Sequence, residues 1–406
     1  MKKRKPLRRC ALISSFSLIV ASFLLLSLQQ TGWNFEGAGS SNSQGTGVNR
    51  DVLRGIHLLY DEQFNDAENL FQKIVAESPE KPEGYFYLAM ASWSRLASGF
   101  WSPEIVEEFR ERIDRTIRVA NSHIENNAAG SYDYFYLGGA LGFKGRFELM
   151  RGKWLSAFFA ANDAVDAFKT CLQMAPDNKD ILLCFGTFDY YTARLSGLLK
   201  FFTRLLVHKG SKEEGLKKLN IAASEAIYSA TEAKSMLLYI YLFLEKDFSK
   251  ALPLAEELEA RYDQNPRYKL LKGVCYIVLG MDLEYEATIH HLRQRSLRSS
   301  SLIMAHLWKR RALYLEAIHD LYNARYPEAR SKIRAILDQS DPENDPWMIA
   351  WPLTKMGMSY DLENNREEAL KYYRRVLDME NGAGAQFLVE KYMDKPPNAK
   401  TPFIGY

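Results

Sequence analysis

Two patterns of apolar residues divide the sequence into a short first segment and a long remainder. Residues 10–28 form an uncharged apolar run that includes Ile13, Phe16 and Leu24. After residue 50, apolar residues recur four positions apart among charged ones, as Ala67 and Phe71 do. Positions four apart lie on one face of an α-helix. The pattern predicts an all-α protein in which one apolar helix precedes many amphipathic ones.

The apolar run 10–28 predicts a membrane-spanning helix. Its nineteen residues would span about 28 Å as a helix, close to the hydrocarbon thickness of a bilayer, about 30 Å. The basic segment 1–9 carries six Lys and Arg residues, which should remain cytoplasmic. The run exceeds the apolar core of a usual signal peptide, and no A-x-A site follows it, so an uncleaved signal-anchor is favoured over a cleaved signal. We expect a single-pass membrane protein with its body outside the cytoplasm, in the periplasm if the cell is Gram-negative.

The rest of the chain divides by composition into a linker, a body and a tail. Residues 29–50, which are rich in Gly and Ser, predict a flexible stalk. Residues 51–393 carry the helical pattern and form the body. Residues 394–406 contain Pro396, Pro397 and Pro402, which exclude a regular helix at those positions. We expect this tail either to be disordered or to dock on the last helices.

A repeated spacing of small and aromatic residues runs through the body. Gly55, Ala67, Phe71 and Pro79 stand at offsets of 0, 12, 16 and 24, and Gly357, Ala369 and Tyr373 repeat the first three. The small residue permits close approach of two helices, and the Ala and the aromatic residue share one face of the second helix. These residues and spacings resemble the tetratricopeptide repeat (TPR) family.

The resemblance extends over most of the body. Further units surround Gly186 and Gly273, whereas the segments 101–127 and 138–152 are interpreted as insertions into the array. Counting these units predicts about seven to eight TPR-like helix pairs. The resemblance implies a right-handed α-solenoid, which here follows the N-terminal transmembrane helix.

The resemblance also implies a binding groove on the concave face, formed mainly by the first helix of each pair. In the family, groove residues lie one position and four to five positions after the small residue. Carried onto this chain, the rule indicates an aromatic and aliphatic groove formed by Ala140, Phe143, Thr187, Tyr190, Tyr191, Ile240, Phe243, Val274 and Ile277.

A third insertion, residues 195–209, is amphipathic at helical period. Lys200, Arg204 and His208 share one face, while Phe201 belongs to the apolar remainder. Two interpretations stay open. The segment lies on an anionic membrane surface through Lys200, Phe201, Arg204 and His208, or it packs on its own repeat and exposes a basic stripe.

The chemistry-bearing residues do not indicate catalysis. The sequence has no H-E-x-x-H, G-x-S-x-G or phosphate-loop motif, so we expect neither an enzyme nor a bound cofactor or metal. Six of the 53 basic residues lie in the first nine positions, which leaves 47 against 50 acidic residues and argues against a nucleic-acid partner. Cys171 and Cys184 should lie close together on neighbouring helices, either bonded or as free core thiols.

Two main functions fit these features. The first is a membrane-tethered scaffold or adaptor that recruits protein partners at the cell envelope through the groove. The alternative is a carrier that holds an apolar small molecule or lipid inside the superhelix. Self-association of the array is a third hypothesis.

Overall fold

The computed structural model describes residues 49–126, 129–150, 153–193, 211–339, 345–379 and 381–398. These residues form seventeen α-helices and no strand. The helices are α3 (Arg50–Tyr60), α4 (Phe64–Glu77), α5 (Pro82–Ala97), α6 (Pro103–Asn126), α7 (Ser131–Met150), α8 (Trp154–Met174), α9 (Leu182–Ala193), α11 (Lys212–Glu225), α12 (Ala230–Tyr239), α13 (Phe248–Arg261), α14 (Pro266–Leu279), α15 (Asp282–Arg298), α16 (Leu302–Tyr322), α17 (Tyr326–Leu337), α18 (Trp347–Leu362), α19 (Arg366–Leu377) and α20 (Ala385–Asp394). A 3₁₀ turn, η1 (Lys179–Ile181), precedes α9, and a π-helical segment, η2 (Ile240–Glu245), extends α12.

Several predicted segments lie outside these residues. They include the membrane helix 10–28, nearly all of the stalk 29–50, and Lys200, Phe201, Arg204 and His208 of the amphipathic insertion. Within the described residues, no helix combines the length and apolar character needed to cross a bilayer.

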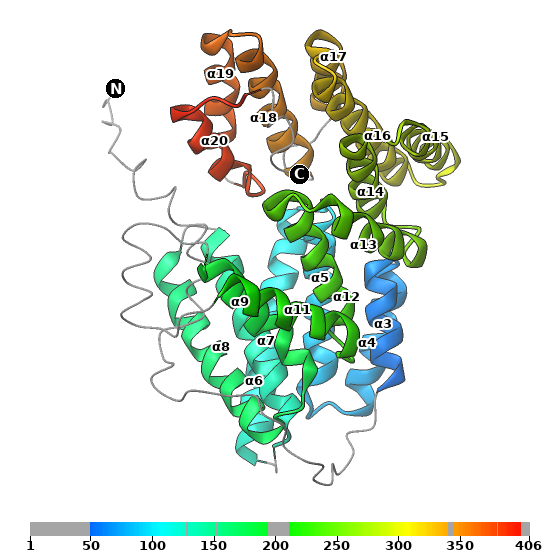
Figure 1. Cartoon of the computed structure of the whole chain (residues 1–406). Coiled ribbons are helices and arrows are strands. Elements are labelled where there is room, and N and C mark those ends of the chain that lie inside the picture. Colours follow the sequence, from blue (N-terminus) through cyan, green and yellow to red (C-terminus); the bar gives the residue numbers. More distant parts are fainter. Residues whose placement is uncertain are drawn as a thin grey trace, which may run out of the picture.

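Consecutive helices pack as hairpins, and the hairpins stack into a solenoid. The pairs are α3–α4, α5–α6, α7–α8, α9–α11, α12–α13, α14–α15, α16–α17 and α18–α19, followed by α20. Figure 1 shows the pairs from α3 to α13 below those from α14 to α19. The eight pairs confirm a TPR-like helical-repeat architecture.

The close approach of paired helices explains the spacing of small and aromatic residues. A Cβ atom at Gly55 would overlap the ring of Phe71, and one at Gly357 would overlap the ring of Tyr373. Both rings are fully buried. Each glycine therefore receives the aromatic side chain sixteen residues later, which lies on the second helix of its pair.

Two expectations about the second and third pairs are wrong. Gly138, not Gly139, is its small residue, because a Cβ at Gly138 would lie 2.8 Å from the ring of Phe168 on α8, whereas one at Gly139 would meet Phe86 on α5. The segments 101–127 and 138–152 are also not insertions. They supply most of α6 and α7, which are regular members of the second and third pairs.

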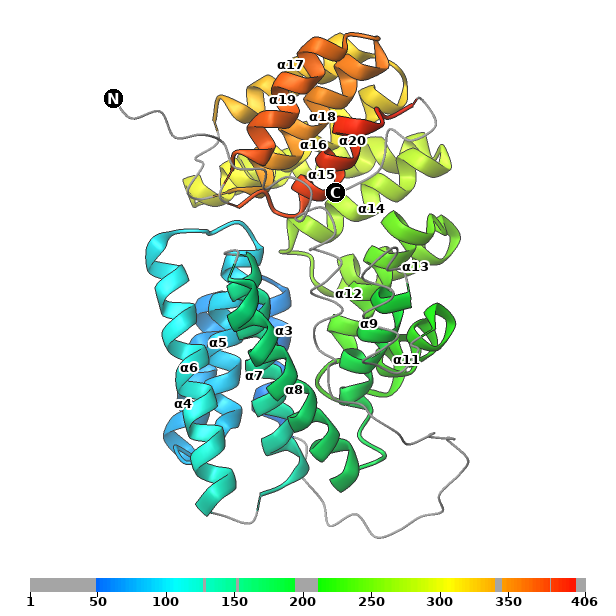
Figure 2. The same cartoon turned by 90° about the vertical axis from the view of Figure 1, so that its left-hand side faces the viewer.

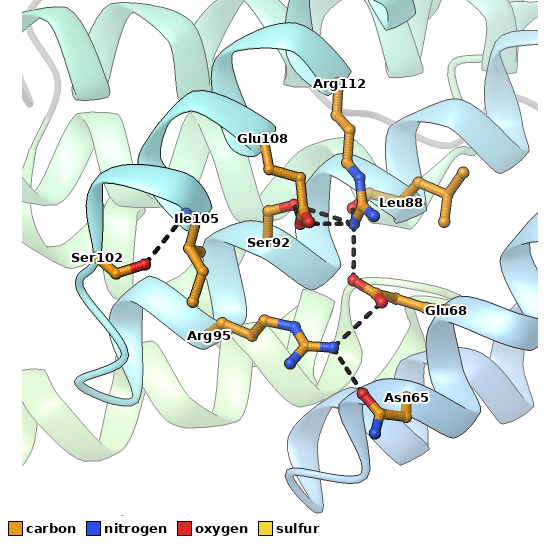
Figure 3. A network of polar contacts seen from close by, with 9 residues as sticks. All are labelled: Asn65, Glu68, Leu88, Ser92, Arg95, Ser102, Ile105, Glu108 and Arg112. Atoms are coloured by element: carbon orange, nitrogen blue, oxygen red, sulfur yellow. Dashed lines mark hydrogen bonds and ion pairs between the residues drawn. The ribbon is translucent and has the colours of Figure 1, made fainter. Parts of the chain in front are cut away.

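A polar network fixes the first two pairs against each other (Figure 3). Arg112 of α6 donates to Glu68 of α4 (2.7 Å) and to Ser92 of α5 (3.0 Å). Arg95 donates to the other oxygen of Glu68 at 3.1 Å, and the hydroxyl of Ser92 donates to Glu108 at 2.6 Å. Two guanidinium groups thus offset the desolvation of a carboxylate that is only 15% exposed.

Helix α3 also contacts the fifth and sixth of these pairs, about 200 residues later. Asn265 Nδ2 donates to the carbonyl oxygen of Tyr60 (2.8 Å), and the hydroxyl of Tyr60 donates to Glu232 (2.5 Å). His57 Nδ1 lies 2.8 Å from the hydroxyl of Tyr262. We call these contacts between α3 and α12–α14 the seam. In Figures 1 and 2 the pairs from α3 to α13 accordingly form one turn of the solenoid, which we call the first turn.

Helix α16 contacts this turn at the loop after α5. Arg311 donates to the carbonyl oxygen of Ser98 at 3.4 Å, and the Ser98 hydroxyl donates to Glu62 at 2.9 Å. Burial raises the pKa of Glu62 to about 7, although the positive charge of Arg311 opposes the rise. The later pairs therefore meet the first turn at a carboxyl group that titrates near neutrality.

Cys171 and Cys184 are free thiols in the structure. Burial raises the pKa of each to about 12, and Cys171 is close enough to contribute to the rise at Cys184. The two side chains therefore lie near each other without a disulfide bond.

Candidate binding surface

Six of the nine residues predicted to form the groove are core residues. Ala140, Tyr190 and Ile240 are fully buried, and Phe243, Val274 and Ile277 are at most 9% exposed. A side chain without exposed surface cannot contact a partner on a folded scaffold. The predicted lining is therefore corrected to Phe143, Thr187 and Tyr191, which are partly exposed.

The buried positions have local explanations. The family rule gives Ala140 when the count starts at Gly139, but the small residue of this pair is Gly138, one position earlier. Tyr190 turns inward and donates its hydroxyl to Glu245 at 2.6 Å. Val274 and Ile277 follow Gly273, which packs against α16, because a Cβ there would overlap Leu315. Helix α14 thus packs on α16 as well as on α15.

The partly exposed residues lie on the first helices of successive pairs. The ring centroid of Phe143 on α7 lies 5.3 Å from that of Trp93 on α5. Tyr191 on α9 donates its hydroxyl toward the sulfur of Met236 on α12, at 3.7 Å. We use the name inner face for the surface of this solenoid turn on which Trp93, Phe143, Thr187, Tyr191 and Met236 lie.

A charged cluster that sequence reasoning missed lies on the inner face. Arg146 of α7 stacks on Trp93, with Cζ 5.0 Å from the ring centroid. Further side chains near enough to influence the charge of Arg146 come from α9, α12 and α14. The Arg146 cluster, as we define it, consists of Trp93, Arg146, Tyr191, Glu232, Tyr239 and Arg267.

The surrounding protein desolvates the guanidinium group of Arg146. Its side chain is exposed, yet its pKa is lowered, and the largest cause is desolvation by the surrounding protein. The positive charge of Arg267 also lowers this pKa, while Glu232 opposes the change. Arg146 is therefore a surface side chain that neighbouring protein groups partly desolvate.

Arg146 is a charged group with no acidic partner in contact. Among the described residues, no hydrogen bond or ion pair involves its guanidinium group. Glu232 accepts the hydroxyl of Tyr60 instead. A guanidinium stacked on an aromatic ring keeps its in-plane N–H donors available, so the cluster is suited to hold an acceptor-bearing group against an aromatic surface.

The sequence contained one signal for this cluster. Gly139, Phe143 and Arg146 follow the spacing i, i+4, i+7, which places them on one face of α7. Phe143 was predicted from the family rule, and Arg146 lies one turn further along the same face. The contributions of Glu232 and Arg267 had no such signal, because they depend on how distant helices meet.

No family model and no curated protein matches this sequence. Among solved structures, the human IFIT1 dimer with PPP-AAAA is similar at 17% identity, with 80% of this chain and 71% of that chain covered and a TM-score of 0.41. The human IFIT1 dimer with m7Gppp-AAAA is similar at 16% identity, with 78% and 67% covered and a TM-score of 0.32. TM-scores below 0.5 do not establish a shared fold or function.

Proposed function

We propose that this chain is a non-enzymatic scaffold or adaptor that holds a segment of a protein partner on its inner face. The observation that carries the proposal is the Arg146 cluster, in which an exposed guanidinium stacks on Trp93 and lies within electrostatic range of Tyr191 and Tyr239 from two other helix pairs. Aromatic and Arg side chains dominate the energetics of protein interfaces. Partly exposed Phe143 and Met236 add apolar contact area beside them.

The charged cluster favours a protein segment over the two other ligand classes. An apolar small molecule or lipid chain would cover Arg146 and Glu232 without pairing them, which costs free energy. A nucleic acid would place phosphates near Glu232, on a chain whose residues after position 9 carry more acidic than basic groups. A peptide can offer both backbone carbonyls and apolar side chains.

We further propose that the scaffold is tethered to the membrane. The apolar run 10–28 would anchor it, with residues 1–9 in the cytoplasm and the repeats outside it. In this arrangement the inner face recruits partners of the cell envelope.

Photo-crosslinking in intact cells tests the binding surface. A photoreactive phenylalanine analogue replaces Phe143 in the full-length chain, and the matched control replaces Phe159, which is 57% exposed on α8. We expect a discrete protein adduct at position 143 that is absent at position 159 and weakened by Arg146→Gln. A lipid or small-molecule adduct would favour the carrier, an adduct with a second copy of the chain would favour self-association, and no adduct at 143 would refute the surface.

A further inference from the structure

A pocket of about 520 Å³ opens at the seam, between α3 and the end of α13. Residues from both helices line it, among them Leu53 and Leu58 of α3, and Tyr262 directly after α13. Because the two sides of the pocket are about 200 residues apart in the chain, it exists only when the seam is formed. The Arg146 cluster does not contribute to it.

Three guanidinium groups line this seam pocket. Arg50 and Arg54 stand one turn apart on α3, so they share a helix face, and Arg261 of α13 lines the same pocket; all three side chains are open to solvent. Within the described part of the chain, none of the three forms an ion pair with an acidic side chain. Like charges one turn apart destabilise a helix, so an anion between them would remove a repulsion that the protein alone leaves in place.

Hydrogen bonds fix Arg261 and keep His57 uncharged. Arg261 Nη2 lies 2.8 Å from His57 Nε2, and His57 Nδ1 lies 2.8 Å from the hydroxyl of Tyr262. The guanidinium can only donate, so Nε2 accepts and the proton of the neutral ring is on Nδ1. Desolvation and the charge of Arg261 lower the pKa of His57, consistent with a neutral ring.

The acidic residue that lines the pocket, Asp61, already has hydrogen-bond partners. Asp61 accepts hydrogen bonds from the backbone N–H of Gln264 (3.0 Å) and the side chain of Gln63 (2.6 Å). With three Arg and one Asp, the lining carries a net charge of +2. Planar guanidinium groups match the oxygens of a phosphate, and the leucines offer an apolar surface beside it.

We infer that the seam pocket binds the phosphate group of an anionic phospholipid. The chain enters α3 directly from the predicted stalk and membrane helix, so the pocket lies where the body starts; this choice of a lipid over a soluble phosphate rests on the proposed membrane tether. Binding would orient the body on the membrane and would stabilise the seam, because the ligand contacts α3 and α13 together.

The test uses the full-length protein in nanodiscs and measures hydrogen exchange of residues 50–60. One nanodisc contains phosphatidylcholine alone, and the other contains one third phosphatidylglycerol. The variant Arg50→Gln/Arg54→Gln removes two charges from the pocket. Its matched control, Arg115→Gln/Arg118→Gln, removes two charges from exposed positions of α6.

We expect phosphatidylglycerol to slow exchange of α3 about tenfold in the wild type and the control, and not in the pocket variant. Equal exchange in both nanodiscs, or slowing that survives in the pocket variant, would overturn the inference. Inorganic phosphate is added to the phosphatidylcholine sample at matched ionic strength. Slowing by phosphate alone would assign the pocket to a soluble anion and overturn the lipid assignment.

The proposed function fails in a different way. A full-length chain that does not enter nanodiscs would refute the tether, and with it the choice of a lipid. A chain that enters nanodiscs but gives no adduct at position 143 in cells would refute the inner face as a binding surface. The inference about the seam pocket would be unaffected.

Discussion

Asn265 provides a direct test of whether the first turn is closed at the seam. Asn265 is 7% exposed, and its side chain accepts one hydrogen bond and donates another. Its Oδ1 accepts from the N–H of Arg267 and caps α14 (3.0 Å), and its Nδ2 donates to the Tyr60 carbonyl at the end of α3 (2.8 Å). Asn265→Asp keeps the shape and the cap, because Asp is an equally good N-cap, but removes the donor.

The expected effect follows from the group left without a partner. Leaving this partly buried carbonyl without its donor costs about 1–3 kcal/mol. The new carboxylate also faces the negative end of the α3 dipole, which roughly offsets its favourable position at the start of α14. The free energy of local opening of α3 should therefore fall by about 1–3 kcal/mol, which corresponds to about 5- to 150-fold faster exchange.

The measurement is amide hydrogen exchange of the full-length chain, resolved to residues 50–60. Asn365→Asp is the matched control, because Asn365 caps α19 through the N–H of Glu368 (3.3 Å) but is exposed and lies far from the seam. We expect fast exchange of α3 only in Asn265→Asp. If α3 exchanges at the wild-type rate in both variants, the seam does not hold the first helix and the reasoning is refuted.

Three further predictions concern packing, pH and the thiols. Gly55→Ala should destabilise the protein by about 1–3 kcal/mol because its methyl group overlaps a buried ring, whereas Gly142→Ala, with no atom within 4 Å of the new Cβ, should stabilise it by about 0.5–1 kcal/mol; equal shifts of the urea midpoint would contradict the packing argument. Because Glu62 has a folded-state pKa of about 7, above its usual 4.5, its contribution to stability is greatest below pH 4.5 and is lost as the pH rises through 7. The melting temperature should accordingly fall over that range more in the wild type than in Glu62→Gln, and parallel pH profiles would count against this. Cys171 and Cys184, with pKa values of about 12, should resist alkylation at pH 8 in the native protein and both react after denaturation without a reductant; a thiol that appears only after reduction would reveal a disulfide.

The repeat architecture was predictable from the sequence because its contacts are local. Gly55 meets Phe71 sixteen residues later, and a fixed offset of this size survives as a pattern in the chain. The same rule indicated Phe143, which is partly exposed on α7. It failed at Val274, because α14 packs against α16 as closely as within its own pair.

The charged part of the inner face and the seam could not be predicted in this way. Arg146 and Glu232 are 86 residues apart, and the distance between them depends on the curvature accumulated over three pairs. A periodic pattern specifies how one pair packs on the next, but not which distant pairs of the solenoid come into contact. Tyr60 and Asn265 show the consequence, because nothing near either residue in the sequence indicates the other.

The seam also limits how this protein can change in length. In an open solenoid each repeat touches only its neighbours, so repeats can be gained or lost along the array without disturbing the remainder. Here the pairs between α3 and α12 must bring Tyr60 back to Glu232 and Asn265. An added or deleted pair within this span would displace α12 and α14 from α3 by one helix pair. The hydrogen bonds of the seam could then not form. Arg311 of α16 also contacts Ser98, in the loop after α5. We therefore expect duplications and deletions to be tolerated best after α16.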